Sequence, residues 1–127
     1  MGTITKAVLL SICLTHSIYA LEWVSYEDAL QIQKQTKKPI MIDVVRTLCH
    51  YCNDMNDNVF ENEAMATWLE ERFIPVKINL DFNSMPIDQE VSFTPTFFFL
   101  DTQGKIIKKI PGSWNIQDFK DLTRNIK

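Results

Sequence analysis

The segment PIMIDVVRTLCHYCNDM, residues 39–55, decides the fold of this chain. It begins with a proline and continues through a short apolar run rich in β-branched residues, which is typical of a buried strand. Cys49 and Cys52 follow directly, and the apolar residues after them return at helical spacing from Met55 onward. We therefore predict that the two cysteines lie where a buried strand gives way to a helix.

The segments on either side alternate between helical and strand patterns. Ser25, with an acid three residues later, is a capping signal for a helix. The turn TQGK joins two strands as an antiparallel hairpin, whereas strand–helix–strand connections imply parallel neighbours. We thus expect an α/β fold with a mixed central sheet of four to five strands and helices on both faces. The patterns predict helices at 25–38, near 55–60, at 62–73 and at 115–127, and strands at 39–45, 74–81, 94–101 and 106–112. A short strand at 21–24 would be the fifth strand of the sheet.

The composition limits the class of protein. The chain has 127 residues, of which 46% are hydrophobic and 23% charged, and this suits one globular domain with its own core. The formal charge of −3 comes without any cluster of Lys and Arg, which argues against a nucleic-acid partner. No dimerisation module is evident, so we expect a monomer, and we expect it to carry no cofactor.

The first twenty residues differ in kind from the rest. A short leader with one lysine precedes the apolar run AVLLSICLTHSIYA, which ends in a small residue. This pattern predicts a secretory signal peptide over residues 1–20, cut after Ala20, and a mature domain over residues 21–127 in the periplasm or outside the cell. An uncleaved membrane anchor and lipidation at Cys13 are the alternatives that the sequence leaves open.

Several kinds of site use a Cys-x-x-Cys pair. Haem attachment requires a histidine directly after the second cysteine, and Asn53 stands there instead. A structural zinc ion needs four ligands, and outside the first twenty residues the chain has no cysteine or histidine besides the pair and His50, so we expect no metal. A disulfide that closes so small a loop adds little stability through chain entropy. A reversible redox couple is therefore the favoured interpretation, with a pair of inert buried thiols as its alternative.

The start of a helix gives Cys49 a chemical advantage. Backbone N–H groups without partners and the positive end of the helix dipole stabilise a thiolate there relative to the thiol. On the first turn of a helix, the first sulfur of the pair faces solvent and the second lies behind it. We therefore expect Cys49 to be the nucleophile that attacks a disulfide, and Cys52 to be the thiol that resolves the mixed disulfide.

Asp43 lies inside the apolar strand, six residues before Cys49. An ionised carboxylate is costly in such a place unless it has a partner or a purpose. Burial raises the pKa of a carboxyl group, which suits a group that moves a proton at neutral pH. We predict that Asp43 is the base, acting through water, that deprotonates Cys52. The alternative is that the strand ends early and that Asp43 is solvated.

The motif FTPT, residues 93–96, stands just before the strand pattern TFFFL. A proline is not tolerated within a central strand, and this one fits a cis peptide bond between Thr94 and Pro95. An ordinary trans proline that opens a strand is the alternative. A cis turn leaves the backbone of Thr94 beside the sulfurs, where an extended substrate segment can bind as an added strand. We expect Phe93, Thr94 and Pro95 to contact substrate.

Three motifs carry a resemblance to a known family. PIMIDVVRTLCHYC, FTPTFFFLDTQGKII and IPGSW together resemble the thioredoxin superfamily, and the likeness spans roughly residues 22–127. Within that superfamily, it more closely resembles secreted bacterial thioredoxin-like proteins and the C-terminal domain of DsbD-type membrane reductases. This resemblance implies the thioredoxin fold, disulfide exchange, and the roles given above to the site residues. Leu48, His50 and Tyr51 depart from the tryptophan and the Gly-Pro pair usual at these positions.

The residues and the resemblance together predict a thiol–disulfide oxidoreductase. Its substrates are protein disulfides and thiols, and we expect a periplasmic reductase that a DsbD-type membrane donor recharges. The competing interpretation is a binding or chaperone module whose cysteines are not catalytic and whose surface at Tyr51 and Trp114 docks a partner. We expect His50 and Tyr51, between the cysteines, to contact substrate. A charged His50 beside Cys49 favours the thiolate and makes the disulfide more oxidising.

Overall fold

The computed structural model describes Gly2 and residues 20–127. The predicted signal peptide and the lipidation alternative at Cys13 lie outside the described residues, apart from Gly2 and Ala20. Within residues 20–127, every helix is too short or too polar to cross a membrane.

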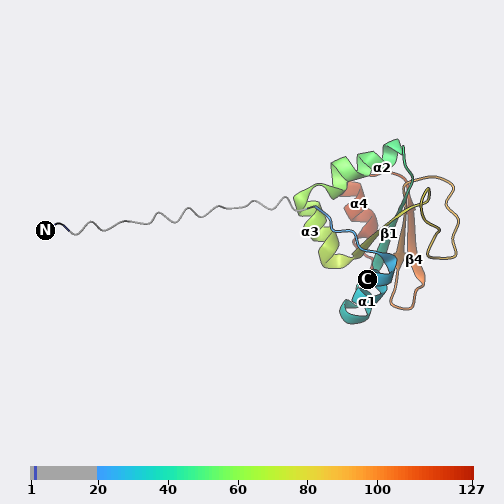
Figure 1. Cartoon of the computed structure of the whole chain (residues 1–127), viewed down its shortest axis with the longest axis horizontal. Helices are drawn as coiled ribbons and strands as arrows, with labels where there is room; N and C mark the ends of the chain where they lie inside the picture. Colours follow the sequence, from blue (N-terminus) through green and yellow to red (C-terminus); the bar gives the residue numbers. More distant parts are fainter. Residues whose placement is uncertain (1, 3–19) are drawn as a thin grey trace.

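The described chain forms helices and strands in the predicted alternation (Figure 1). Its helical segments are α1 (Tyr26–Thr36), α2 (His50–Met55), the π-helix η1 (Asn56–Phe60), α3 (Glu63–Arg72) and α4 (Ile116–Thr123). Its strands are β1 (Ile40–Val45), β2 (Ile74–Asn79), β3 (Thr96–Leu100) and β4 (Ile106–Pro111).

The strands form one mixed sheet in the order β2-β1-β3-β4. β1 is parallel to β2 and antiparallel to β3, and β3 is antiparallel to β4. The predicted mixed sheet is thus confirmed, with four strands among the described residues. The possible strand at 21–24 is reduced to a single parallel bridge between Val24 and Val76. It cannot extend, because the next residue, Ser25, already caps α1 by accepting a hydrogen bond from the Asp28 N–H.

Helices cover both faces of the sheet, as predicted (Figure 1). α2, η1, α3 and α4 pack on one face, and α1 packs on the other. The two faces receive alternate residues of the strands, because successive side chains of a strand point in opposite directions. The strand residues of the first core are Met41, Phe97, Phe99 and Ile110, and those of the second are Ile40, Ile42, Val44, Ile74, Val76, Phe98 and Leu100.

The stretch between β1 and β2 positions the cysteine pair. β1 is buried along its whole length, and the chain leaves its carboxyl end through residues 46–48 and enters α2. α2 runs directly into η1, where the Glu61 N–H donates to the Asn56 carbonyl oxygen in an i to i+5 pattern. The sequence predicts a helix here but gives no sign of its π form, and such segments are frequent at functional sites.

Candidate functional site

Cys49 and Cys52 lie at the start of α2 and are joined by a disulfide bond. Cys49 is the N-cap residue of the helix and is partly exposed, whereas Cys52 is buried with 5% of its surface exposed. The N–H of Cys52 donates to the Cys49 sulfur at 3.2 Å. The geometry therefore places one sulfur within reach of a visiting molecule and the other behind it, as the spacing of the pair predicts.

Residues 46–48, which lead into the pair, are held by side chains from the loop after β2. Asp81 accepts hydrogen bonds from the Thr47 N–H at 2.8 Å and from the Arg46 guanidinium at 3.2 Å. Leu48 follows with a positive φ of 56° and is 99% exposed. The backbone hydrogen bond from Thr47 is the main reason that the pKa of Asp81 lies below its ordinary value. Sequence reasoning missed this anchor, because it joins segments more than thirty residues apart.

We expect Asp81→Ala to lower kcat/KM for disulfide exchange several-fold while hardly changing the melting temperature. The reason is that the loop that carries Leu48 and Cys49 loses its only carboxylate acceptor from the described chain, and small misplacements of a reacting group are costly. The matched control is Asp81→Asn, which keeps an acceptor oxygen and should retain most of the activity. Equal activity of the alanine variant and the wild type would show that the loop holds its position without Asp81.

The FTPT motif lies against the cysteine pair. The Thr94–Pro95 peptide bond is cis, which confirms that prediction. The Thr94 hydroxyl donates to the Cys49 sulfur at 3.2 Å, and the Thr94 carbonyl oxygen lies 3.5 Å from the same sulfur. The turn is held from the other side, because the Gly112 N–H donates to the Pro95 carbonyl oxygen at 2.8 Å. Thr94 thus touches the exposed cysteine directly, while Pro95 is buried.

Asp43 is buried in β1, with only 1% of its surface exposed, so the alternative of a solvated side chain is wrong. Burial raises its pKa from 3.8 to about 7, and the positive charge of Lys77 opposes that rise. The Lys77 ammonium nitrogen lies 3.8 Å from Asp43 Oδ2, and Asp43 Oδ1 has no hydrogen-bond partner among the described residues. A carboxyl group in this state exchanges a proton readily near neutral pH, which is the chemistry that the sequence predicts for it.

Lys77 is a site residue that sequence reasoning missed. It lies on β2 directly opposite Asp43 in the parallel register of β1 and β2. Burial lowers the pKa of Lys77, and the neighbouring carboxylate of Asp43 opposes this. A signal was present, since Lys77 interrupts the apolar strand pattern of IPVKINLD just as Asp43 interrupts its own strand. Only the register of the two strands shows that these residues face each other.

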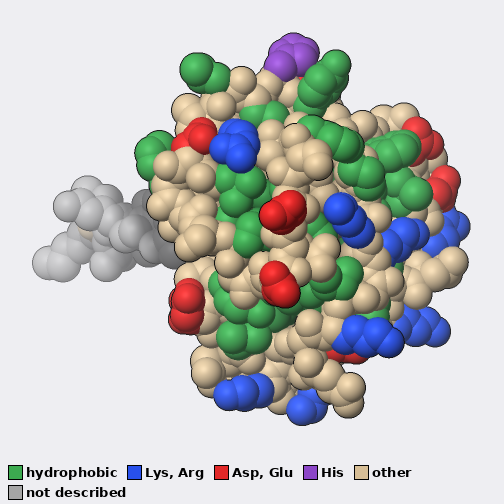
Figure 2. Space-filling view, turned by 90° about the vertical axis from the view of Figure 1, so that its right-hand side faces the viewer, with side chains coloured by type: hydrophobic (Ala, Val, Ile, Leu, Met, Phe, Trp, Pro, Cys, Tyr) green, Lys and Arg blue, Asp and Glu red, His purple; other side chains and the backbone are tan. Residues whose placement is uncertain are grey.

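The remaining predicted site residues are on the surface around the pair. Tyr51 and Phe93 are exposed hydrophobic side chains, as is Leu48. His50 is exposed, and its Nε2 lies 3.4 Å from Asp54 Oδ2. Figure 2 shows hydrophobic side chains gathered at the end of the molecule where the purple histidine projects.

Trp114 contributes less to this surface than the binding-module interpretation supposed. It is partly buried against the core. Its backbone N–H donates to the Met55 sulfur, and its indole N–H donates to the Pro111 carbonyl oxygen. Of the two aromatic residues that this interpretation named, Tyr51 is therefore the one that the fold leaves open to a partner.

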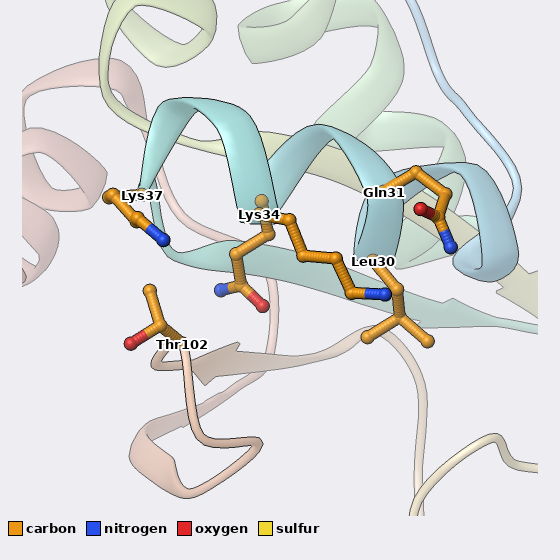
Figure 3. A pocket seen from close by; sticks show the side chains of 6 residues that line it. Leu30, Gln31, Lys34, Lys37 and Thr102 are labelled. Atoms are coloured by element: carbon orange, nitrogen blue, oxygen red, sulfur yellow. The ribbon is translucent and has the colours of Figure 1, made fainter.

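The rest of the described chain offers no second cluster of this kind. No group of three or more His, Cys, Asp or Glu residues within residues 20–127 is arranged to hold a metal ion. A cavity of about 210 Å³ lies between α1 and the turn after β3 (Figure 3). It is at the opposite end of β1 from the cysteines, and none of the predicted site residues lines it. Its lining residues are Leu30, Gln31, Gln33, Lys34, Lys37 and Thr102.

Comparison with known proteins gives consistent matches. Residues 26–127 match the family model described as a thioredoxin-like domain. A solution structure of a thioredoxin from Thermus thermophilus is 28% identical, with a TM-score of 0.67 over 84% of this chain and 87% of that one. The C-terminal domain of Neisseria meningitidis DsbD in its oxidised form has the same fold at 18% identity, with a TM-score of 0.63 over 84% of this chain and all 100% of that one.

The curated relatives are much longer proteins. An uncharacterised protein of Caenorhabditis elegans is 34% identical over 67 residues, which are 52% of this chain and 9% of that protein. This chain therefore matches less than a tenth of the length of that relative, and the likeness concerns one domain of it.

Proposed function

Because this chain belongs to the thioredoxin-like domain family, as its motifs predict, we propose that it is a thiol–disulfide oxidoreductase and, more specifically, a periplasmic reductase of protein disulfides. One observation carries the proposal. The partly exposed Cys49 sulfur is bonded to the buried Cys52 sulfur at the start of α2, and Thr94 lies against it. In the proposed reaction, this disulfide is the state that the protein reaches after it has reduced a substrate.

The reaction balances with these two sulfurs alone. The Cys49 thiolate attacks one sulfur of a substrate disulfide, which forms a mixed disulfide and releases one substrate thiolate. Cys52, deprotonated by Asp43 through water, then attacks the Cys49 sulfur and releases the second substrate thiolate. The substrate gains two electrons, and the protein is left with the Cys49–Cys52 disulfide. An external dithiol must reduce this disulfide before the next cycle.

Two hydrogen-bond donors support the role of Cys49. The Cys52 N–H and the Thr94 hydroxyl both point at its sulfur at 3.2 Å. Hydrogen bonds to a charged group favour the charged form, so both contacts favour the thiolate in the reduced protein.

The surface around Cys49 fits an extended protein segment. Leu48, Tyr51 and Phe93 offer exposed apolar contacts. None of the hydrogen bonds among the described residues uses the Thr94 N–H, so it can pair with a substrate backbone laid alongside as an added strand. We expect proteins with exposed or unfolded disulfide segments, rather than small disulfides, to be the preferred substrates.

The periplasmic location and the electron donor are parts of the same proposal. The location rests on the signal-peptide pattern of residues 1–20. A DsbD-type membrane donor is supported by the shared fold with the DsbD C-terminal domain. A periplasmic reductase needs such a donor, because the reducing thiol pools of the cytosol do not reach that compartment.

The test of the proposal is the reduction of insulin disulfides by dithiothreitol, followed by equilibration of the protein with glutathione. A reductase speeds insulin reduction, and its reduction potential lies nearer that of thioredoxin, about −270 mV, than that of DsbA, about −120 mV. A chain that leaves the insulin rate unchanged while still binding protein partners would instead be the binding module. A chain with a potential near that of DsbA would be an oxidant.

We expect His50→Gly to lower the reduction potential by some tens of millivolts, where 30 mV corresponds to about 1.4 kcal/mol. His50 Nε2 lies 3.4 Å from Asp54 Oδ2, and a positive charge beside Cys49 stabilises the thiolate of the reduced protein. Equilibration with glutathione measures the change. His50→Gln is the matched control for backbone effects, and it should lower the potential by the same amount. A potential equal to that of the wild type in the glutamine variant would exclude the charge as the cause.

A further inference from the structure

Besides Asp43, three other side chains lie close to the Lys77 ammonium group. Its nitrogen donates to Asn56 Oδ1 at 2.7 Å and lies 4.3 Å from the ring centroid of Trp23. The Phe60 ring centroid lies 5.7 Å away, and the Trp23 and Phe60 rings contact each other edge to face at 5.1 Å. We call Trp23, Asn56 and Phe60 the lysine cradle. A cation is attracted to the face of an aromatic ring, and more so when it is partly removed from water.

The fold builds this lysine cradle from three separate segments. Asn56 and Phe60 are the first and last residues of η1, so the π-helix turns one side chain toward Lys77 and the other toward the ring of Trp23. Trp23 is fixed by the bridge that follows it, in which the Val24 N–H donates to the Pro75 carbonyl oxygen at 3.0 Å. The buried side chain of Leu21 anchors the other side of the segment.

We propose that the lysine cradle fixes the Lys77 ammonium beside Asp43, so that Trp23 and Asn56 are positioning residues for the proton transfer from Cys52. The inference rests on the proposed function for its purpose. The backbone N–H of Asn56 donates to the Cys52 carbonyl oxygen within the helix, but the side chains of Asn56 and Trp23 lie against Lys77. They act through Lys77, whose charge sets how readily the buried carboxyl group gives up and takes up its proton.

The other charged groups near Lys77 are few. Asp43 faces it from β1, Glu61 at the end of η1 lines the same pocket, and Glu27 of α1 lines the pocket on the other side of Lys77. β3 places the uncharged Phe97 opposite Asp43 in the sheet register. Asp43 is the one carboxylate among the described residues that forms an ion pair with Lys77. A change in the position of Lys77 should therefore change the pKa of Asp43 more than that of Glu61 or Glu27.

The experiment measures the pKa of Asp43 directly, by NMR of its carboxyl carbon. Lys77→Met removes the nearby positive charge and should raise this pKa by about one pH unit or more. Trp23→Leu and Asn56→Leu should each raise it by a part of that amount, and Trp23→Phe should restore most of the wild-type value. The pH profile of the step in which Cys52 resolves a mixed disulfide should move to higher pH in parallel.

The double variants decide whether the effect passes through Lys77. In the Lys77→Met background, Trp23→Leu and Asn56→Leu should cause no further change in the Asp43 pKa, because coupled residues are not additive. Trp68→Leu is the matched control, since Trp68 makes a comparable contact with the Arg72 guanidinium, at 4.7 Å, and is not part of the lysine cradle. It should change the melting temperature without changing the Asp43 pKa.

Two results would overturn the proposal. One is an Asp43 pKa that is unchanged, or lowered by water entry, when Trp23 or Asn56 is replaced. The other is an effect of full size that persists without Lys77. The carboxyl titration does not depend on turnover, so a protein that failed to reduce disulfides would refute the proposed function without affecting this result.

Discussion

Cys49→Ser is expected to abolish the stimulation of insulin reduction, leaving only the rate of dithiothreitol alone. The partly exposed sulfur of Cys49 is the atom that a substrate disulfide can reach, whereas Cys52 is buried behind it. A serine hydroxyl cannot replace the sulfur, because the reaction passes through a mixed disulfide. The melting temperature should change little even against the oxidised wild type, since the lost disulfide closes too small a loop to contribute much chain entropy.

Cys52→Ser is the matched variant, and its expected result differs in kind. The first attack still occurs, but the mixed disulfide is not resolved, so Cys49 should stay covalently bound to its substrate. Gel analysis without reducing agent detects this complex, and mass spectrometry of the captured proteins identifies the substrates. The order of labelling gives a second check, since an alkylating reagent should modify Cys49 before Cys52 in the reduced protein. Capture by the Cys49→Ser variant instead would reverse the two roles.

The sequence predicts those parts of the site that depend on local chemistry. The transition from strand β1 to helix α2 at the cysteine pair follows from the apolar run that precedes the pair. The start of α1 follows from Ser25, whose side chain accepts a hydrogen bond from the Asp28 N–H, as expected of a cap. The cis bond before Pro95 follows from a proline at the edge of a central strand pattern.

The parts that the sequence does not predict depend on long-range register. Lys77 faces Asp43 because β1 and β2 pair in the register that places these two residues opposite each other, and the residue pattern of either strand alone does not give that register. Asp81 reaches the loop before Cys49 for the same reason. The π form of η1 has no residue pattern of its own. It places Asn56 against Lys77 and Phe60 against Trp23, and these contacts are known only from the structure.

The second large effect concerns stability, and its sign follows from the pKa of Asp43. The folded protein raises this pKa from 3.8 to about 7, so the folded state binds the proton more tightly than the unfolded state. The stability that this difference provides is fully present below pH 3.8, the pKa in the unfolded state, and it is lost as the pH rises toward and through about 7, the pKa in the folded state. The two pKa values differ by about three pH units, each worth about 1.4 kcal/mol, so the loss at alkaline pH is on the order of 4 kcal/mol.

Asp43→Asn removes this loss, because an amide does not ionise. We therefore expect the variant to be more stable than the wild type by about 2–4 kcal/mol near pH 9, and to be nearly equal to it at about pH 3. Urea unfolding at several pH values measures both. Asp57→Asn, which removes one exposed negative charge from η1, is the matched control and should change stability little at any pH.

The same substitution should slow the reaction while it strengthens the fold. Without the Asp43 carboxylate, Cys52 loses its proposed base, and we expect the resolving step to slow by about a hundredfold. Stopped-flow measurement of a preformed mixed disulfide at Cys49 isolates that step from the first attack.

A destabilised variant would show that Asp43 is held in the core by structural contacts. A variant that is more stable but resolves the mixed disulfide at the wild-type rate would show that the buried carboxylate destabilises the fold without contributing to the reaction. Only the combination of gained stability and lost rate fits a carboxyl group that is kept in the core for proton transfer, because a group retained for packing alone would gain nothing from being ionisable.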